Sequence, residues 1–153
     1  MDISQITDQL YIGKTPTAKD YDTLRALGVQ LVINMRFERR PFRDLHDPAL
    51  TALWLPTFDT PLIRIPVPTL LRGVQVAQAV LADGGKVYVH CAGGAHRGVA
   101  MGAAILISQG YTADQAMALI KARRPAADPY ARYIRRQIER FEEAWKKLDT
   151  SRN

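Results

Sequence analysis

Residues 86–98 read Lys-Val-Tyr-Val-His-Cys-Ala-Gly-Gly-Ala-His-Arg-Gly, and they are the most informative stretch of the chain. The apolar centre of residues 86–90 predicts a short strand. A glycine-containing loop follows, and residues 99–108 are then almost entirely apolar, which predicts a helix buried on every side. A strand that runs through a short loop into a buried helix is typical of α/β proteins. In such proteins ligands bind beyond the carboxyl ends of the strands.

Strand and helix patterns alternate on both sides of this stretch. We expect further strands at residues 10–13, 29–35 and 52–55, and helices at 17–27, around 70–81, after a capping box at 112–115, and at the end of the chain. The last helix carries one apolar stripe, made of Tyr130, Ile134, Ile138, Phe141, Trp145 and Leu148. We therefore predict one α/β domain over residues 1–149, with a polar tail at 150–153. Its core is a central, mostly parallel twisted sheet of four to five strands flanked by helices.

Length and composition exclude several classes of protein. The chain has 153 residues, enough for one domain, and its 47% hydrophobic and 24% charged residues exclude a disordered or coiled-coil chain. Lys plus Arg exceed Asp plus Glu by 21 − 15 = 6, which favours an anionic partner. Cys91 is the single cysteine, so no intramolecular disulfide can form. No apolar run is long enough to span a membrane and the first residues do not resemble a signal peptide, so we expect a cytoplasmic protein without a membrane segment.

The residues of loop 91–98 suit the chemistry of phosphate. Gly93 and Gly94 allow a tight turn whose backbone amides can form an anion-binding nest, and the start of the following helix adds a positive dipole end. At the rim of such a nest Cys91 is expected to ionise to a nucleophilic thiolate near neutral pH. Arg97 offers a planar fork for two oxygens of a tetrahedral oxyanion. This combination favours phosphoryl transfer through a phosphocysteine.

Residues 90–97 resemble the His-Cys-x5-Arg phosphate-binding loop of the cysteine-dependent protein tyrosine phosphatases, and the small chain resembles their dual-specificity branch. Residues 10–13, 32–36 and 123–125 are also similar to that branch, so the resemblance covers most of the chain. It implies that the phosphatase P-loop lies between a core strand and the buried helix, with no cofactor and no metal. The residues that the resemblance assigns to phosphate binding are Ala92, Gly93, Gly94, Ala95, His96, Arg97 and Gly98.

The resemblance also implies a general acid on an upstream loop and a supporting role for the histidine before the cysteine. The candidate acid is Asp59, 32 residues before Cys91, and the supporting residue is His90. His96 either contacts the phosphate or the bound substrate, or it faces solvent. Other acidic residues in upstream loops remain alternatives to Asp59; they are Glu38, Asp44 and Asp47.

One residue departs from the family pattern. Ser or Thr usually follows the arginine and helps the cysteine thiolate to leave in the second step, whereas this chain has Gly98. Our hypothesis is that hydrolysis of the phosphoenzyme is slow and that phosphocysteine accumulates. The other interpretation of Gly98 is a loop that binds phosphate with little catalysis.

The expected function is hydrolysis of phosphomonoesters, with phosphotyrosine in proteins as the first candidate substrate and phosphoserine and phosphothreonine as further ones. The alternatives are a phosphoinositide phosphatase, an RNA 5′-phosphatase and a weakly active pseudophosphatase. The expected partner is a phosphorylated protein or another phosphomonoester, and we expect a monomer. Specific nucleic-acid binding is not expected, because aromatic residues do not interleave with the basic ones.

Two groups of arginines lie outside the phosphate-binding loop. The first either lines the substrate approach or forms a solvated loop; it consists of Arg36, Arg39, Arg40 and Arg43. The second is expected on the wet face of the last helix; it consists of Arg132, Arg135 and Arg136.

Overall fold

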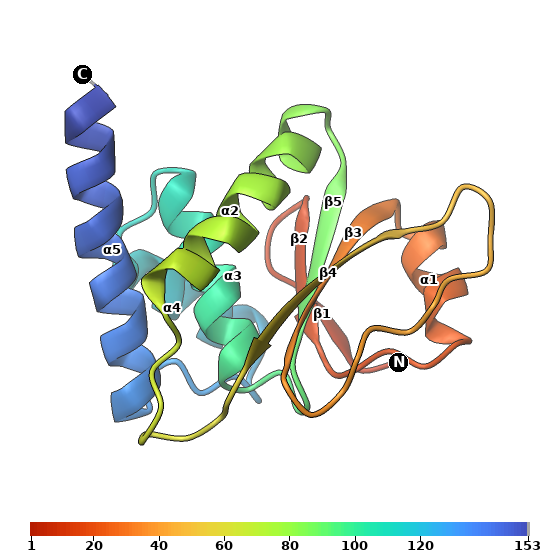
Figure 1. The fold of residues 1–153 in the computed structure, drawn as a ribbon, viewed down its shortest axis with the longest axis horizontal. Helices are drawn as coiled ribbons and strands as arrows, with labels where there is room; N and C mark the ends of the chain where they lie inside the picture. Colours follow the sequence, from red (N-terminus) through yellow and green to blue (C-terminus); the bar gives the residue numbers. More distant parts are fainter. Residues whose placement is uncertain (153) are drawn as a thin grey trace.

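Five strands form one sheet in the computed structural model, which describes residues 1–152 (Figure 1). The order across the sheet is β1-β2-β5-β3-β4; β1 is antiparallel to β2, and the other neighbours are parallel. The strands are β1 (Ile3–Gln5), β2 (Leu10–Gly13), β3 (Val29–Arg36), β4 (Thr51–Thr57) and β5 (Lys86–His90). The predicted α/β architecture with a mostly parallel sheet is therefore confirmed.

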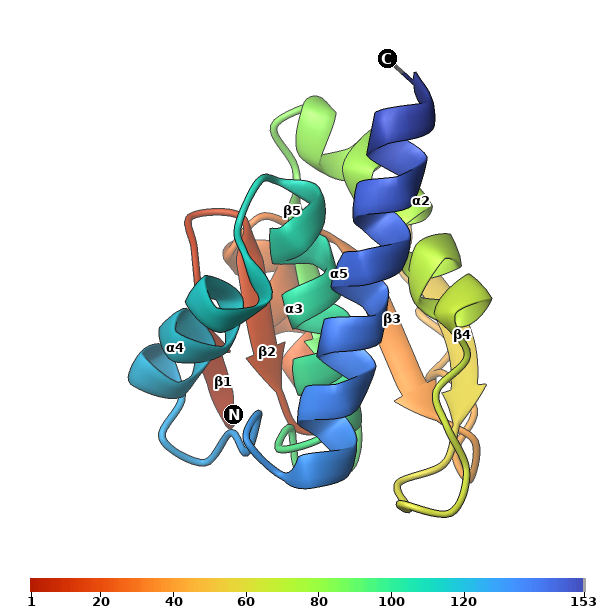
Figure 2. The same ribbon diagram turned by 90° about the vertical axis from the view of Figure 1, so that its left-hand side faces the viewer.

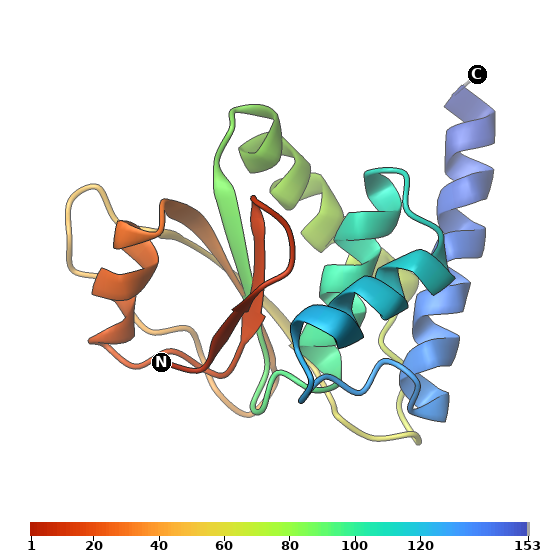
Figure 3. The ribbon, with the colours of Figure 1, turned by 180° about the vertical axis from the view of Figure 1, so that it is seen from behind.

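Helices cover both faces of this sheet. The helices are α1 (Asp20–Ala26), α2 (Val67–Ala82), α3 (Arg97–Ser108), α4 (Ala113–Arg123) and α5 (Arg132–Arg152). One face carries α1 alone, where Tyr21 and Leu24 pack against Val32 and Tyr88, and the other helices lie on the opposite face (Figures 1 and 3). No helix within residues 1–152 is long and apolar enough to cross a membrane.

The main core surrounds α3, which lies between the sheet and α5 (Figure 2). Every residue from Arg97 to Ile107 is buried, as the apolar sequence predicted. A helix enclosed in this way fixes the position of its first residues, and those residues directly follow loop 91–96. The fold therefore holds the loop between two rigid elements, β5 and α3.

Some local predictions were wrong. The short, largely polar β1 was not expected, and α1 begins at Asp20 rather than after Thr17, which makes no side-chain cap bond. The apolar stripe of α5 is buried only in its middle, because Tyr130 precedes the helix and is 50% exposed while Leu148 is 39% exposed.

The predicted capping box is confirmed, because Thr112 and Gln115 exchange both of its hydrogen bonds. Residues 150–152, expected in a polar tail, continue α5, and residue 153 lies outside the described residues.

Candidate active site

The carboxyl ends of the four parallel strands meet at one edge of the sheet, and the candidate site is built there. β5 leads straight into loop 91–96 and α3, at the lower edge of the molecule in Figures 1 and 3. The segments that leave β2, β3 and β4 supply Thr15, Glu38 and Asp59 to this edge. Residues that are far apart in sequence are therefore brought together by strand topology, as expected for an open parallel sheet.

The carbonyl groups of loop 91–96 point outward and are held by other segments. The bonds join Cys91 O to Thr15 Oγ1 (2.8 Å), Gly93 O to Arg124 Nη2 (3.0 Å), Gly94 O to Arg124 Nε (2.9 Å), and Ala95 O to the Asp128 amide (2.9 Å). Across a planar trans peptide the next amide points the opposite way, so the amides of Ala92, Gly94, Ala95 and His96 face the inside of the loop. Within residues 1–152 none of these four amides donates a hydrogen bond to another group. The loop therefore presents a nest of free donors to an anion.

Arg124 is the main support of this loop. Its buried guanidinium donates to the Gly93 and Gly94 carbonyls. It also donates to Asp2 (2.8 and 3.2 Å), which precedes β1, and to Ser4 Oγ (3.1 Å), which lies in β1. Gly94 has φ +67°, and a Cβ there would lie 2.6 Å from Gly13 O and 2.7 Å from Arg124 Nη2. Glycine is thus required at position 94 by both backbone conformation and space.

Arg97 is buried, with a side chain only 4% exposed, and its guanidinium donates three hydrogen bonds. Nη1 donates to Glu38 Oε2 (3.0 Å) and Thr57 O (2.8 Å), and Nη2 donates to Glu38 Oε1 (2.8 Å). Nε has no partner although it is buried. Because guanidinium has five N–H donors, Nε–H and the second Nη2–H are left as a free edge that can grip two oxygens. Burial opposes the charge, but the bonds to Glu38 and the charges of Cys91 and Asp59 raise the pKa of Arg97.

Glu38 is kept ionised by its hydrogen bonds to arginine side chains. The hydrogen bonds from Arg97, and those from Arg36 (2.8 Å from Nε to Oε1), hold the pKa of Glu38 far below its usual range despite partial burial. Arg36 also donates to Thr15 Oγ1 at 2.9 Å. Glu38 is therefore ionised at neutral pH and cannot carry a proton for catalysis.

Asp59 lies against His96 and Tyr133. Tyr133 Oη donates to Asp59 Oδ1 at 2.5 Å, and His96 Nδ1 lies 3.0 Å from Asp59 Oδ2. The other nitrogen of His96, Nε2, lies 3.2 Å from Asp128 Oδ2. Burial and the bond to Asp59 raise the pKa of Tyr133, so this hydroxyl stays protonated. The side chain of His96 thus lies between two carboxylates.

The remaining acidic alternatives lie elsewhere. Asp44 is bound to Arg25 and accepts the amide of Leu50 at 2.7 Å. Asp47 lines a pocket with Val29, at the amino end of β3 and therefore at the opposite edge of the sheet. Among the four acidic candidates, Asp59 is the one that lies beside loop 91–96 and has no arginine partner in the described part of the chain. No group of three or more His, Cys, Asp or Glu side chains in the described part of the chain is arranged to hold a metal ion.

His90 is buried, stacks on Tyr88 with 5.7 Å between ring centroids, and has Nδ1 3.3 Å from Cys91 O. Burial lowers the pKa of His90 from 6.5 to about 4. The side chain is consequently neutral at physiological pH and lies behind the loop.

The pKa of His90 predicts a loss of stability in mild acid. Between pH 6.5 and pH 4 the unfolded chain binds a proton at this position that the folded chain does not, so stability falls as pH falls. We expect the free energy of unfolding to drop by about 2 kcal/mol from this group between pH 7 and pH 5. Urea unfolding at several pH values checks this, with His90→Asn as the comparison. If both proteins lose equal stability over that window, His90 is not the cause.

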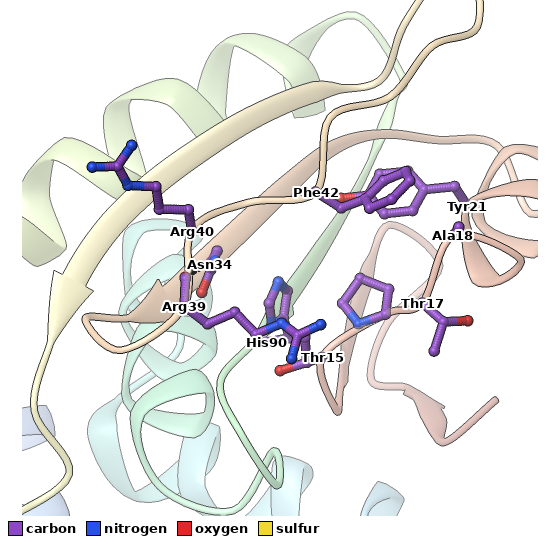
Figure 4. Close-up of a pocket in the computed structure, with 10 residues that line it drawn as sticks. Thr15, Thr17, Ala18, Tyr21, Asn34, Arg39, Arg40, Phe42 and His90 are labelled. Atoms are coloured by element: carbon purple, nitrogen blue, oxygen red, sulfur yellow. Dashed lines mark hydrogen bonds between the residues drawn. The ribbon is translucent and has the colours of Figure 1, made fainter.

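A pocket of about 310 Å³, lined by both polar and apolar side chains, lies beside the loop (Figure 4). His90, Thr15 and Asn34 form its inner side, and Arg39 points toward Thr15 and His90, whereas Arg40 points away. Arg36 is part of the bonded network, and Arg39 belongs to this pocket, so these two arginines of the basic loop are not simply solvated.

Sequence reasoning missed three supporting groups. Arg124, Tyr133 and Asp128 all come from the segment between α4 and α5 or the first turn of α5. In the sequence, residues 123–125 are similar to the family, but this similarity gives Arg124 no role. The sequence signal for a buried role of Arg124 is weak, because an arginine in a polar segment is normally exposed.

Comparisons with known proteins agree with this geometry. A family model described as dual specificity phosphatase, catalytic domain, matches residues 10–144. Mouse dual specificity phosphatase 28 is 27% identical over 141 residues, which are 92% of this chain and 83% of that protein. Mouse dual specificity protein phosphatase 14 is 29% identical over 140 residues, covering 90% of this chain and 68% of the other. The crystal structure of human DUSP28 is similar in fold, with a TM-score of 0.84, 24% identity, and coverage of 95% and 96% of the two chains.

The family match covers nearly all of the sheet and most of the helices described above. It includes loop 91–96, the helix that follows, and the segment that holds Arg124. The chain belongs to the dual specificity phosphatase catalytic-domain family and is a cysteine-dependent protein phosphatase.

Proposed function

We propose that this chain hydrolyses phosphotyrosine in proteins through a phosphocysteine at Cys91. The observation that carries the proposal is the set of unpartnered donors around the end of β5. Four amides of loop 91–96 and the Nε of Arg97, the residue that directly follows the loop, have no acceptor among the described residues. Nε of Arg97 is buried, and a buried donor is normally satisfied, so an anion with several oxygens is the natural partner of Arg97 and of the neighbouring loop amides.

The two steps follow from these groups. The Cys91 thiolate attacks phosphorus, the bond from phosphorus to the leaving oxygen breaks, and Asp59 gives that oxygen its proton. The loop amides and Arg97 hold the three equatorial oxygens throughout. Asp59 then takes a proton from water, the resulting hydroxide attacks phosphorus, and the sulfur–phosphorus bond breaks to regenerate the thiolate.

His96 is proposed to orient the proton of Asp59. When Nε2–H donates to Asp128, Nδ1 has a lone pair and accepts a hydrogen bond from protonated Asp59. Tyr133 donates to the other oxygen of Asp59 and so directs the carboxyl group. His96 is in this view a positioning residue and not a phosphate ligand.

An aromatic pair supports phosphotyrosine as the substrate. Phe37 and Phe58 lie with ring centroids 4.5 Å apart and are 55% and 40% exposed. Phe37 is adjacent in sequence to Glu38, and Phe58 lies between Thr57 and Asp59, so the pair belongs to the segments that supply groups to Arg97 and His96. An aromatic rim favours an aryl phosphate over the shorter phosphoserine.

Rapid-quench kinetics with a phosphotyrosyl peptide test the function. We expect an acid-stable phosphoenzyme in the first turnover, with the added phosphate located by mass spectrometry on the peptide that contains Cys91. A phosphoseryl peptide of the same sequence should react more slowly. A pseudophosphatase would give no phosphoenzyme and no product with either peptide, and that result would overturn the proposal.

Gly98→Ser is expected to accelerate the second step. A Cβ at this position would lie 3.4 Å from Cys91 N and 3.4 Å from His90 C, which is ordinary van der Waals contact, so serine fits beside the cysteine. Its hydroxyl could stabilise the departing thiolate, and we expect phosphoenzyme hydrolysis to rise by about tenfold. The measurement is the burst amplitude and the steady rate, with Gly98→Ala as the matched control. Equal rates in all three proteins, without a burst, would show that Gly98 does not limit turnover.

A phosphoinositide headgroup is the second candidate substrate. The pocket of Figure 4 places Arg39 at the same edge as loop 91–96, where it could meet a further phosphate of such a substrate. A soluble inositol phosphate in the rapid-quench experiment separates the two substrates. All the proposed groups come from one copy of the chain, so a monomer is sufficient for the reaction. Cys91 must stay a thiol, which requires a reducing compartment such as the cytoplasm.

A further inference from the structure

Four arginines surround one pocket outside the groups described so far. The pocket has a volume of about 280 Å³ and is lined by Pro61, Arg64, Arg132, Tyr133, Arg136, Gln137 and Arg140. Arg132, Arg136 and Arg140 follow each other at four-residue intervals, so they form a row along one face of α5. Arg135 lies on a different face, where it pairs with Glu139 at 2.8 Å. Arg132, Arg135 and Arg136 are all exposed, as expected for the wet side of this helix, but only Arg132 and Arg136 line the pocket.

These four arginines have no counter-ion within residues 1–152. No hydrogen bond or ion pair joins any of them to another described residue, and no carboxylate lines their pocket. Other arginines of the protein are paired, among them Arg25, Arg36, Arg97, Arg124 and Arg135. Like charges around one concavity repel each other, so the pocket is complementary to an anion.

Two apolar side chains project from the same segment. Leu62 is 90% exposed and Ile63 is 49% exposed, and they lie between Pro61 and Arg64, which both line the pocket. Exposed apolar residues next to a basic cluster are typical of surfaces that lie in the interfacial region of a membrane.

The arginine row is also wider than one phosphate group. Eight residues of helix separate Arg132 from Arg140, which is about 12 Å along the axis. Such a row can meet several headgroups side by side. A phosphorylated peptide would be served by the arginines alone and would leave Leu62 uncovered, so the combination favours a lipid surface.

We infer that this surface, made of Leu62, Ile63, Arg64, Arg132, Arg136 and Arg140, docks the protein on anionic phospholipid membranes. Lipid phosphates enter the arginine pocket while Leu62 and Ile63 enter the headgroup region. Tyr133 lines the pocket and binds Asp59, so docking brings the membrane next to the candidate active site. The loop after β4 and the first turns of α5 lie at the same end of the molecule in Figure 2. This inference goes beyond the proposed function and does not depend on it.

Vesicle sedimentation tests the docking surface. The probe is a set of vesicles of phosphatidylcholine with about one third phosphatidylserine, compared with phosphatidylcholine alone, at low and physiological salt. We expect the protein to bind only the anionic vesicles, and to bind more weakly as salt rises. Arg136→Gln with Arg140→Gln should weaken binding by about 30-fold, and Leu62→Ser by about tenfold.

The matched control is Arg135→Gln with Lys146→Gln, which removes the same net charge from α5 outside the docking surface. It should bind vesicles like the unaltered protein. Equal weakening in both double variants, or equal binding to neutral vesicles, would overturn the inference. Tight binding of a doubly phosphorylated peptide without vesicle binding would also overturn it and assign the arginines to a protein partner. Hydrolysis of para-nitrophenyl phosphate should be unchanged in all these variants, so a failure of docking is distinguishable from a failure of catalysis.

Discussion

Cys91→Ser is expected to abolish turnover of a phosphotyrosyl peptide, by at least about 10⁴-fold in kcat, because serine cannot supply a thiolate nucleophile. The loop amides and Arg97 remain in place, because the bonds that hold the loop involve backbone carbonyls and not the Cys91 side chain. Binding of inorganic phosphate, measured by calorimetry, should therefore stay within about threefold of the unaltered protein. Rapid-quench experiments should show no phosphoenzyme.

The pair of readouts separates the two roles of the loop. Loss of both turnover and phosphate binding would mean that the substitution disturbs the loop, and circular dichroism with thermal unfolding would show whether the fold persists. Turnover above about one hundredth of the original rate would contradict a cysteine nucleophile. Asp59→Ala is the companion variant, and it should lower kcat with a smaller effect on KM.

Arg97→Lys is expected to lower kcat/KM by about 10³-fold although the positive charge is retained. Arginine uses one edge for Glu38 and keeps Nε–H and one Nη2–H for substrate oxygens, and a lysine ammonium cannot do both. Most of the loss should appear in kcat, because the arginine stabilises the charge on the equatorial oxygens more strongly in the transition state than in the bound substrate.

Glu38→Gln is the control that isolates the orientation of Arg97. Its amide keeps one hydrogen bond to the guanidinium and removes the negative charge, so we expect a loss of about tenfold. The double variant Arg97→Lys with Glu38→Gln should be hardly worse than Arg97→Lys alone, because Glu38 acts through the arginine. Independent, additive losses would show that Glu38 has a separate role.

Local patterns explain how much of this architecture the sequence could predict. β5, loop 91–96 and α3 were predicted because the strand, the glycines and the apolar helix are contiguous. The family resemblance then directed attention to Asp59, which the strand topology does place beside the loop. β1 was missed because three half-polar residues carry almost no strand signal, and only pairing with β2 stabilises them.

The parts of the site that the sequence did not predict depend on contacts between distant residues. The pairing of Arg97 with Glu38 joins residues 59 positions apart, and Arg124 reaches the loop from 30 positions away. Neither side chain has a local pattern, since an arginine is buried only when distant partners satisfy it. Neither of the two roles considered for His96 included its contacts with Asp59 and Asp128, which depend on a chain turn that follows α4.

The outward bonds of loop 91–96 have a consequence for the thermodynamics of binding. The carbonyls are tied to Thr15, Arg124 and Asp128, and Arg124 is tied in turn to Asp2 and Ser4. The conformational entropy of the loop is therefore lost when the chain folds, before any ligand arrives. Association with a small dianion then requires little further ordering, and more of the interaction free energy appears as affinity. The same arrangement makes the loop depend on the chain's first residues, so that detachment of β1 would return the loop to a flexible ensemble.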